Sequence, residues 1–156
     1  MSIEKVKDYF ASRGMLQRVI ELDVSSATVD LAAQALGVEA CRIAKTLSFS
    51  VENNPVLVVA AGDARIDNSK FKNFFNTKAK MLSHEDAARL IGHAVGGVCP
   101  FAVNEGVLVY LDESLKRFPT VYPACGSGNS AIELTISELE EHSGSCNWVN
   151  VCKNWE

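Results

Sequence analysis

Two apolar segments joined by a tight turn constrain the fold of this chain more than any other feature. Residues 46–51 alternate between apolar and hydroxyl side chains, which predicts a strand with one face in the core. The segment "ENNP", residues 52–55, then has the composition of a turn. The segment "VLVVAA", residues 56–61, is a continuous apolar run, which is typical of a strand buried on both faces.

The remaining pattern predicts helices and strands that intermix without strict alternation. Helices are expected from Ser2 to near Gly14, between a Thr28 cap and Gly37, over a short turn at 41–44, after caps at Asp67 or Asn68 and at Ser83, and from Ser137. Strands are expected at 19–22, 98–103, 107–111, 120–124, 131–136 and 148–151. This order predicts a mixed α/β (α+β) fold, a single compact domain over residues 1–156 with helices packed on a mixed sheet. The strand–helix junctions lack the glycine motifs of dinucleotide-binding and P-loop proteins.

Composition narrows the class of protein. With 156 residues, 47% of them hydrophobic, and a net charge of −4, the chain is expected to be globular and is not a broadly basic nucleic-acid protein. No apolar run is long enough to span a bilayer, and the N-terminus lacks the apolar core of a signal peptide, so a cytoplasmic protein is expected. The five cysteines form no CxxC pair, which predicts buried thiols and no metal site. A nucleophilic Cys99 or Cys125 stays open, although no motif pairs either with a base.

Lys45 stands out because counting back by two from Leu47 along the apolar face reaches a charged residue. One interpretation is structural, a lysine at the end of a short helix that offsets the negative end of its dipole. The other is functional, a partly enclosed ammonium at the mouth of a pocket that binds a carbonyl or phosphate oxygen. Spacing alone leaves both open.

Two glycine-rich segments could form loops against a ligand. In "VGGVCPF", residues 95–101, adjacent glycines permit close backbone approach, and their N–H groups could form an anion nest or oxyanion hole. In "CGSGNSAIEL", residues 125–134, two glycines bracket a serine and an asparagine follows. Taken alone, the first segment is more typical of a bulge or tight turn and the second of a hairpin connection.

A cluster of basic residues lies on this otherwise acidic chain. Residues 65–80 hold five of the fifteen basic side chains and one acid, Asp67; the five are Arg65, Lys70, Lys72, Lys78 and Lys80. Such a cluster is either a solvated helix face or a docking strip for a phosphate backbone.

Taken in order, "AKTLSF", "VGGVCPF" and "PTVYPACGSGNSAIEL" resemble the YbaK/prolyl-tRNA-synthetase-associated family. The resemblance extends from the N-terminal helix to about Leu139. It implies a compact mixed α/β domain around a curved sheet, and an activity that hydrolyses the ester of mischarged aminoacyl-tRNA without metal or cofactor.

The resemblance also implies roles for particular residues. Lys45 takes the place of the family's essential lysine. With tRNA as the substrate, the basic cluster is expected to supply phosphate contacts from Arg65, Lys70 and Lys72. The substrate-binding residues are expected in the two glycine loops, namely Gly96, Gly97, Val98, Cys99, Pro100, Gly126, Ser127 and Asn129. Relatives that act on cysteinyl-tRNA carry an aspartate where this chain has Ala131, so small aliphatic or hydroxylated aminoacyl groups are expected instead.

The expected partner is aminoacyl-tRNA, with an aminoacyl-tRNA synthetase as a possible second partner and no DNA or membrane. The main alternative is a non-catalytic module that binds aminoacyl-tRNA or a synthetase through the same loops. A small-molecule or nucleotide-binding regulatory domain is a further alternative.

Overall fold

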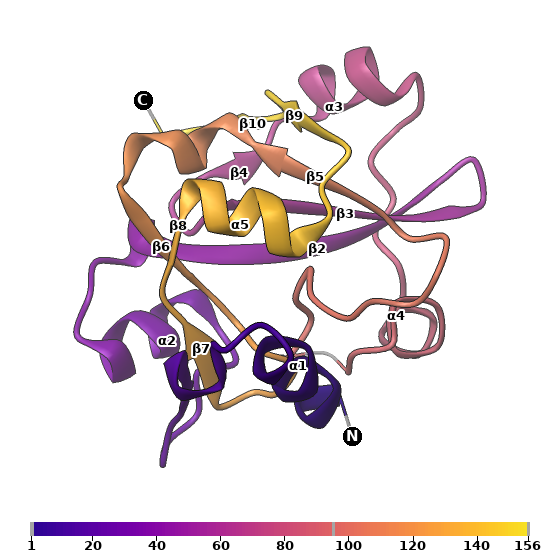
Figure 1. Cartoon of the computed structure of the whole chain (residues 1–156). Coiled ribbons are helices and arrows are strands. Elements are labelled where there is room, and N and C mark those ends of the chain that lie inside the picture. The colour runs from indigo at the N-terminus through magenta and orange to yellow at the C-terminus, as the bar shows by residue number, and fades with distance from the viewer. Residues whose placement is uncertain (1, 95, 156) are drawn as a thin grey trace.

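The hairpin predicted from residues 46–61 is the long central feature of the structure (Figure 1). This structure is a computed structural model that describes residues 2–94 and 96–155. Strands β2 (Ile43–Val51) and β3 (Asn54–Ala61) pair antiparallel in unbroken register, from Ala44 opposite Ala61 to Val51 opposite Asn54. The turn between them places Glu52 and Asn53 at positive φ, which matches the twist of a tight hairpin.

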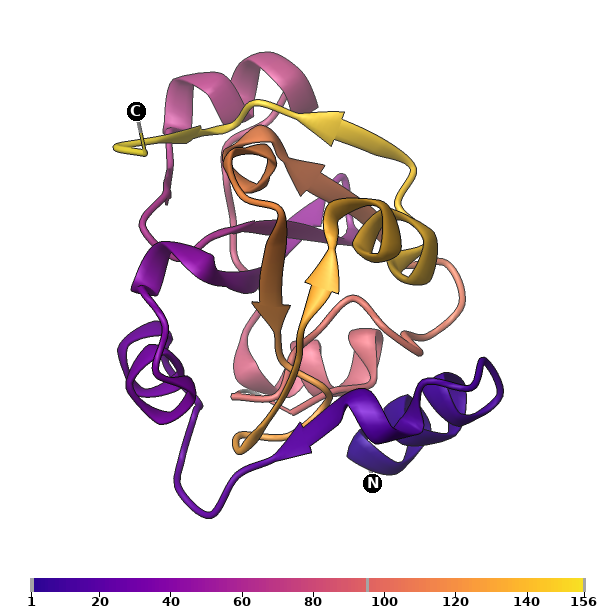
Figure 2. The ribbon, with the colours of Figure 1, turned by 60° about the vertical axis from the view of Figure 1, so that its left-hand side comes forward.

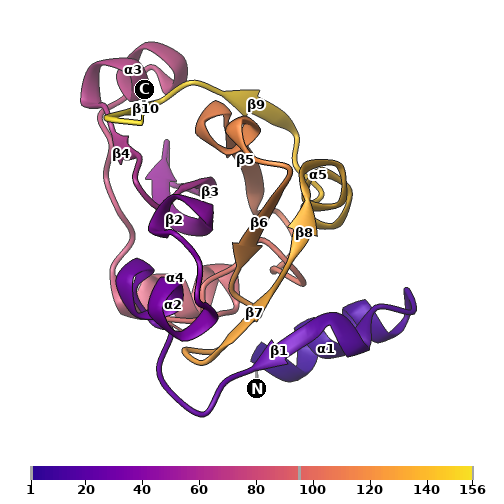
Figure 3. The same ribbon diagram turned by 90° about the vertical axis from the view of Figure 1, so that its left-hand side faces the viewer.

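Four further strands extend the hairpin into a six-stranded sheet in the order β8-β6-β2-β3-β5-β9. Pairing is mixed, since β2/β6, β3/β5 and β5/β9 are parallel while β2/β3 and β6/β8 are antiparallel. The added strands are β5 (Leu108–Asp112), β6 (Thr120–Pro123), β8 (Leu134–Thr135) and β9 (Asn147–Val149). The sheet curves strongly, as the turned view in Figure 3 shows.

Two short antiparallel pairs lie outside this six-stranded sheet. One joins β1 (Val19–Glu21) to β7 (Ser130–Ile132), and the other joins β4 (Arg65–Ile66) to β10 (Cys152–Lys153). The second pair places the C-terminal segment close to α3. This end of the molecule lies opposite α1 (Figures 1 and 2).

Five α-helices and three short 3-10 helices are found in the described part of the chain. The α-helices are α1 (Ser2–Ala11), α2 (Val29–Leu36), α3 (Asn68–Phe75), α4 (His84–Ile91) and α5 (Ile136–Ser143). The 3-10 helices are η1 (Leu16–Arg18), η2 (Ala40–Arg42) and η3 (Glu113–Arg117). None of the helices within the described ranges is both long and apolar enough to cross a membrane.

The predicted helix caps are confirmed. The side chains of Thr28, Asp67 and Ser83 each accept a hydrogen bond from the backbone N–H three residues on, which satisfies a free donor of the first turn. Helix α5 begins at Ile136 and not at Ser137, because Thr135 and Glu138 form a complete capping box.

The core is centred on β3, whose residues 56–61 are all at most 2% exposed. Burial of apolar side chains on both faces of this strand contributes favourably to the free energy of folding, because these side chains are removed from water. The prediction of a strand buried on both faces is therefore confirmed, and so is the mixed α/β fold class.

One expected strand is absent, and two other expected elements have different bounds. Residues 98–103 form no strand: Pro100 has no N–H for a ladder and Ala102 adopts φ 50°, so this buried segment packs as irregular chain. The short helix expected at 41–44 is η2, and β2 already begins at Ile43. The strand expected at 131–136 is split into β7 and β8.

Candidate functional site

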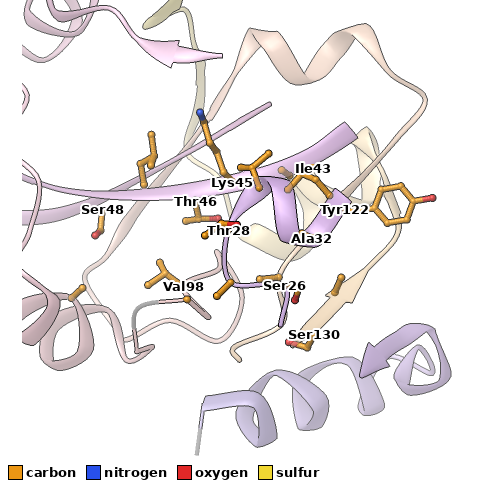
Figure 4. A pocket seen from close by; sticks show the side chains of 18 of the residues that line it. Ser26, Thr28, Ala32, Ile43, Lys45, Thr46, Ser48, Val98, Tyr122 and Ser130 are labelled. Carbon is orange, nitrogen blue, oxygen red and sulfur yellow. The ribbon is translucent and has the colours of Figure 1, made fainter. Parts of the chain in front are cut away.

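A cavity of about 350 Å³ opens beside β2 and is walled mostly by small and apolar side chains. We call it the first cavity (Figure 4). Its walls come from β2, from α2 and the segment that precedes it, and from α4. The two glycine-rich segments complete the wall. The lining residues include Ser26, Thr28, Ala32, Ile43, Lys45, Thr46, Ser48, Met81, His84, Gly96, Val98, Tyr122, Ser130 and Ala131.

The hydroxyl side chains of β2 and the side chain of Lys45 lie on opposite sides of the strand. Thr46 and Ser48 extend toward Val98 inside the first cavity, whereas Lys45 extends from the other side of the strand (Figure 4). Lys45 is the third residue of β2 and pairs with Ala60, so its interpretation as a helix-end lysine is wrong. The alternation of a strand therefore sets Lys45 and Thr46 on opposite faces, with the lysine at the edge of the cavity.

The ammonium of Lys45 is half-buried and donates hydrogen bonds to two backbone carbonyl groups. The acceptors are the carbonyl oxygens of Ala64 and Gly62, the latter at 3.5 Å. Burial lowers the pKa of the Lys45 ammonium from its ordinary value, the Arg65 charge lowers it further, and Cys152 and Asp63 act against the shift. The lysine is thus held in a fixed position where water is partly excluded and a charge interacts strongly with a ligand.

Lys45 also lines a second, more open hollow of about 750 Å³, which we call the cationic cleft. Val29 and Lys45 belong to the walls of both hollows, so the two meet at the lysine. The other lining residues of the cleft are Asp30, Ala40, Gly62, Asp63, Arg65, Ile66 and Lys153.

The two glycine loops predicted from the sequence lie against each other. A Cβ atom at Gly97 would lie 2.5 Å from the backbone nitrogen of Ser127, a distance at which the backbone must move. Gly97 therefore permits the contact that joins the loops. Gly128 has ordinary space around it, since a Cβ atom there would lie 3.5 Å from the Cβ of Ala27.

The predicted loop residues divide into those that line the first cavity and those that support it. Gly96 and Val98 are in the wall, whereas Gly97, Cys99 and Pro100 are buried behind it. The N–H of Gly97 donates to the Ala94 carbonyl oxygen at 3.0 Å, so that group serves the loop itself and not an anion nest. Val95 lies outside the described residues.

The second glycine loop acts mainly as a support. Gly126, Ser127 and Asn129 lie outside the lining of the first cavity, and their neighbours Ser130 and Ala131 form part of it. The Ser127 hydroxyl donates to Ser130 Oγ at 2.8 Å, and Asn129 Nδ2 donates to the Leu22 carbonyl oxygen at 3.0 Å. The first bond lies within the loop, and the second ties the loop to the segment that precedes α2.

Sequence reasoning missed two hydroxyl groups in the cavity. Ser26 Oγ and Thr46 Oγ1 are buried without a hydrogen-bond partner among the described residues. Both residues line the first cavity, and a buried polar group without a partner carries a free-energy cost that a polar ligand atom can offset. The alternation of residues 46–51 could have identified Thr46, because it places the hydroxyl side chains of this strand together on one face. Nothing in the sequence marks Ser26.

For Cys99, the nucleophilic interpretation fails on geometry. Cys99 Sγ lies 3.5 Å from His93 Nε2, but that nitrogen also lies 2.7 Å from the Phe101 carbonyl oxygen, which can only accept. Nε2 therefore carries the ring proton and cannot take one from the thiol. Burial raises the pKa of the Cys99 thiol to about 12 and lowers that of His93. Burial also raises the pKa of Cys125 well above its usual range. Both thiols are therefore buried and protonated, and a protonated thiol is a poor nucleophile.

The predicted phosphate contacts do not form one strip. Arg65 lines the cationic cleft, while Lys72 lines a separate hollow by α3. Lys70 Nζ donates to the Cys152 carbonyl oxygen at 2.9 Å and to Asn150 Oδ1 at 3.3 Å, so it anchors the C-terminal segment.

Over the described ranges, no group of three or more His, Cys, Asp or Glu side chains is placed to hold a metal ion.

Comparison with known proteins assigns the fold and site to a family. A family model described as "Aminoacyl-tRNA editing domain" matches residues 24–141, which include β2, both glycine loops and the walls of the first cavity. The chain belongs to the aminoacyl-tRNA editing domain family. Membership confirms the resemblance drawn from the sequence motifs and supports an editing function.

Individual relatives agree with this assignment. YwhH of Bacillus subtilis (strain 168), described as uncharacterized, is 53% identical over 157 residues and covers all of both chains. A proline–tRNA ligase of Lysinibacillus sphaericus is 30% identical over 72% of this chain, which spans only 20% of that much longer protein. A solved structure described as a candidate trans-editing enzyme for prolyl tRNA synthetase is 31% identical, with a TM-score of 0.87 and 97% of both chains covered.

Proposed function

We propose that this protein is a trans-editing aminoacyl-tRNA deacylase that removes a small amino acid from mischarged tRNA. The observation that carries the proposal is the position of Lys45 in an editing-domain chain, at the meeting of a small cavity and a cationic cleft. The first cavity suits the aminoacyl group, and the cleft lies where the nucleotide would continue. The reaction adds water across the ester, releasing the free amino acid and restoring the ribose hydroxyl of the tRNA.

An aminoacyl ester is already activated, so positioning and charge stabilisation are enough for a useful rate. The Lys45 ammonium, held by two backbone carbonyl groups, would donate to an oxygen of the ester or of the adjoining phosphate. The glycine loops would form the far wall and hold the ester in place. A terminal ribose hydroxyl of the tRNA would help to activate the water, which removes the need for a general base from the protein.

Selectivity would come from the size of the cavity and from its two unpartnered hydroxyls. Gly96, Ala32 and Ala131 keep the walls small, and the carboxylate of the cysteinyl branch is absent at position 131. We therefore expect alanyl and seryl esters to be better substrates than phenylalanyl or long charged ones, although one methylene contributes only about 1–3 kcal/mol of selectivity.

The test is a set of kcat/KM values on one tRNA that carries alanine, serine, cysteine, proline or phenylalanine in turn. The similarity to proline–tRNA ligases makes tRNAPro the first tRNA body to use. We expect the alanyl and seryl esters to be cleaved fastest. A preference for the phenylalanyl ester would contradict the assignment of the cavity, and tight binding with no ester loss would favour the non-catalytic module.

A further inference from the structure

The cationic cleft contains a pair of basic side chains that the basic cluster of the sequence does not reveal. Arg65 of β4 and Lys153 of β10 are far apart in the chain but stand directly opposite each other in the antiparallel pair. Residues directly opposite in such a pair project from the same face, with Cβ atoms about 5 Å apart. Of the second pair in register, Cys152 is fully buried in the core, while Ile66 packs against the core and also contributes to the wall of the cleft.

This pairing of like charges is unfavourable without a ligand. Cations directly opposite one another on a ladder repel, and Lys45 adds a third positive charge to the same cleft. Neither Arg65 nor Lys153 forms an ion pair with any residue that the structure describes. An anion in the cleft would relieve this repulsion.

The acidic residues of the cleft do not cancel the charge. Both carboxylate oxygens of Asp63 are bound by Arg117, at 2.6 and 3.0 Å, so this acid is already neutralised from outside the cleft. Asp30 is the other acid in the lining. Asp67, near Lys153, caps α3 and accepts the N–H of Lys70 at 3.0 Å. Three cations therefore face one unpaired carboxylate among the described lining residues.

The position of the cleft beside the first cavity indicates which kind of anion the cleft would bind. An aminoacyl ester is on the terminal ribose of tRNA, and the nearest phosphate is on the 5′ side of that same nucleoside. The first cavity and the cleft meet at Lys45, so a ligand with its ester in the cavity would carry its phosphodiester backbone into the cleft. We propose that Arg65 and Lys153 form a subsite for the phosphates that lead to the terminal adenosine of aminoacyl-tRNA. This inference rests on the proposed function and extends it.

The test compares two substrates that differ in their phosphates. The double variant Arg65→Gln/Lys153→Gln is assayed on alanyl-tRNA and on 2′(3′)-O-alanyladenosine, which has no phosphate. We expect the ratio of kcat/KM on alanyl-tRNA to kcat/KM on alanyladenosine to fall tenfold or more. The slope of log kcat/KM on alanyl-tRNA against log salt should become shallower by about 1.4, or about 0.7 for each phosphate that is no longer neutralised by a basic side chain.

The matched control is Lys7→Gln/Arg89→Gln, which removes one lysine and one arginine from exposed surface ion pairs. An equal fall on both substrates would show a structural role and overturn the proposal. No fall, or an equal fall in the control, would also overturn it.

If the wild type cleaves neither ester, the deacylase assignment fails, and the subsite is judged on binding alone. The probe is then a fluorescently labelled oligoribonucleotide that ends in CCA, followed by anisotropy. Binding by the wild type and the control, with much weaker binding by Arg65→Gln/Lys153→Gln, would support the subsite. Equal binding by all three proteins, or none by the wild type, would refute it.

Discussion

Replacing Lys45 with methionine separates a functional lysine from a structural one. Methionine keeps most of the apolar stem but removes the ammonium that donates to the Ala64 and Gly62 carbonyl oxygens. A hydrogen bond from a charged group contributes about 1.5–3 kcal/mol, but the Gly62 contact, at 3.5 Å, is at the limit of such a bond. Burial of the ammonium opposes this gain, as the lowered pKa of Lys45 indicates.

The two contributions oppose each other, so we expect Lys45→Met to change the free energy of unfolding by less than about 1.5 kcal/mol. Loss of a donor to developing charge, in contrast, lowers a rate by about 10²–10³. Single-turnover deacylation of alanyl-tRNA and urea unfolding measure the two effects on the same protein. Lys7→Met, which removes an exposed lysine with a surface ion pair, is the control and should alter neither by much.

The pH dependence gives a second check on the same variant. Because the folded-state pKa of Lys45 lies below 10.5, the ammonium opposes folding below that pKa, and this cost disappears as pH rises toward 10.5. The stability of the wild type relative to Lys45→Met should therefore increase over that alkaline interval. A folded Lys45→Met protein with near-normal turnover would refute the role given to this lysine.

Three further changes test other parts of the structure. Gly97→Ala should destabilise the fold by about 1–3 kcal/mol in urea unfolding and lower deacylation, since a Cβ there overlaps the second loop, while Gly128→Ala should be tolerated. Cys99→Ala should retain turnover, and a trapped acyl-thioester would contradict this. The Arg18 ion pair holds the pKa of Glu138 at about 2, below the ordinary 4.5, so its stabilisation is present above pH 4.5 and lost as pH falls through about 2. Arg18→Ala should flatten the dependence of Tm on pH in that interval.

Local patterns determined most elements of this protein. The alternation of residues 46–51, the apolar run of 56–61 and the cap residues Thr28, Asp67 and Ser83 depend on contacts within a few residues, so the sequence was sufficient to predict them. The prediction of a strand at 98–103 is wrong because the apolar residues of this segment are buried by the rest of the fold, not by strand pairing. Burial alone does not distinguish an irregular buried segment from a strand.

The candidate site depended on tertiary structure to a greater degree. The sequence marked Lys45 and both glycine loops, but only the fold shows that Gly97 joins the loops and that Ser26 and Thr46 leave hydroxyls unpartnered in the cavity. The basic cluster does not form one strip, because Arg65 lies in β4 and lines the cleft, whereas Lys70 lies in α3 and binds the C-terminal segment. Lys153, eighty-eight residues beyond Arg65 in the chain, joins it through the register of β4 and β10, a pairing between distant segments that no local pattern encodes.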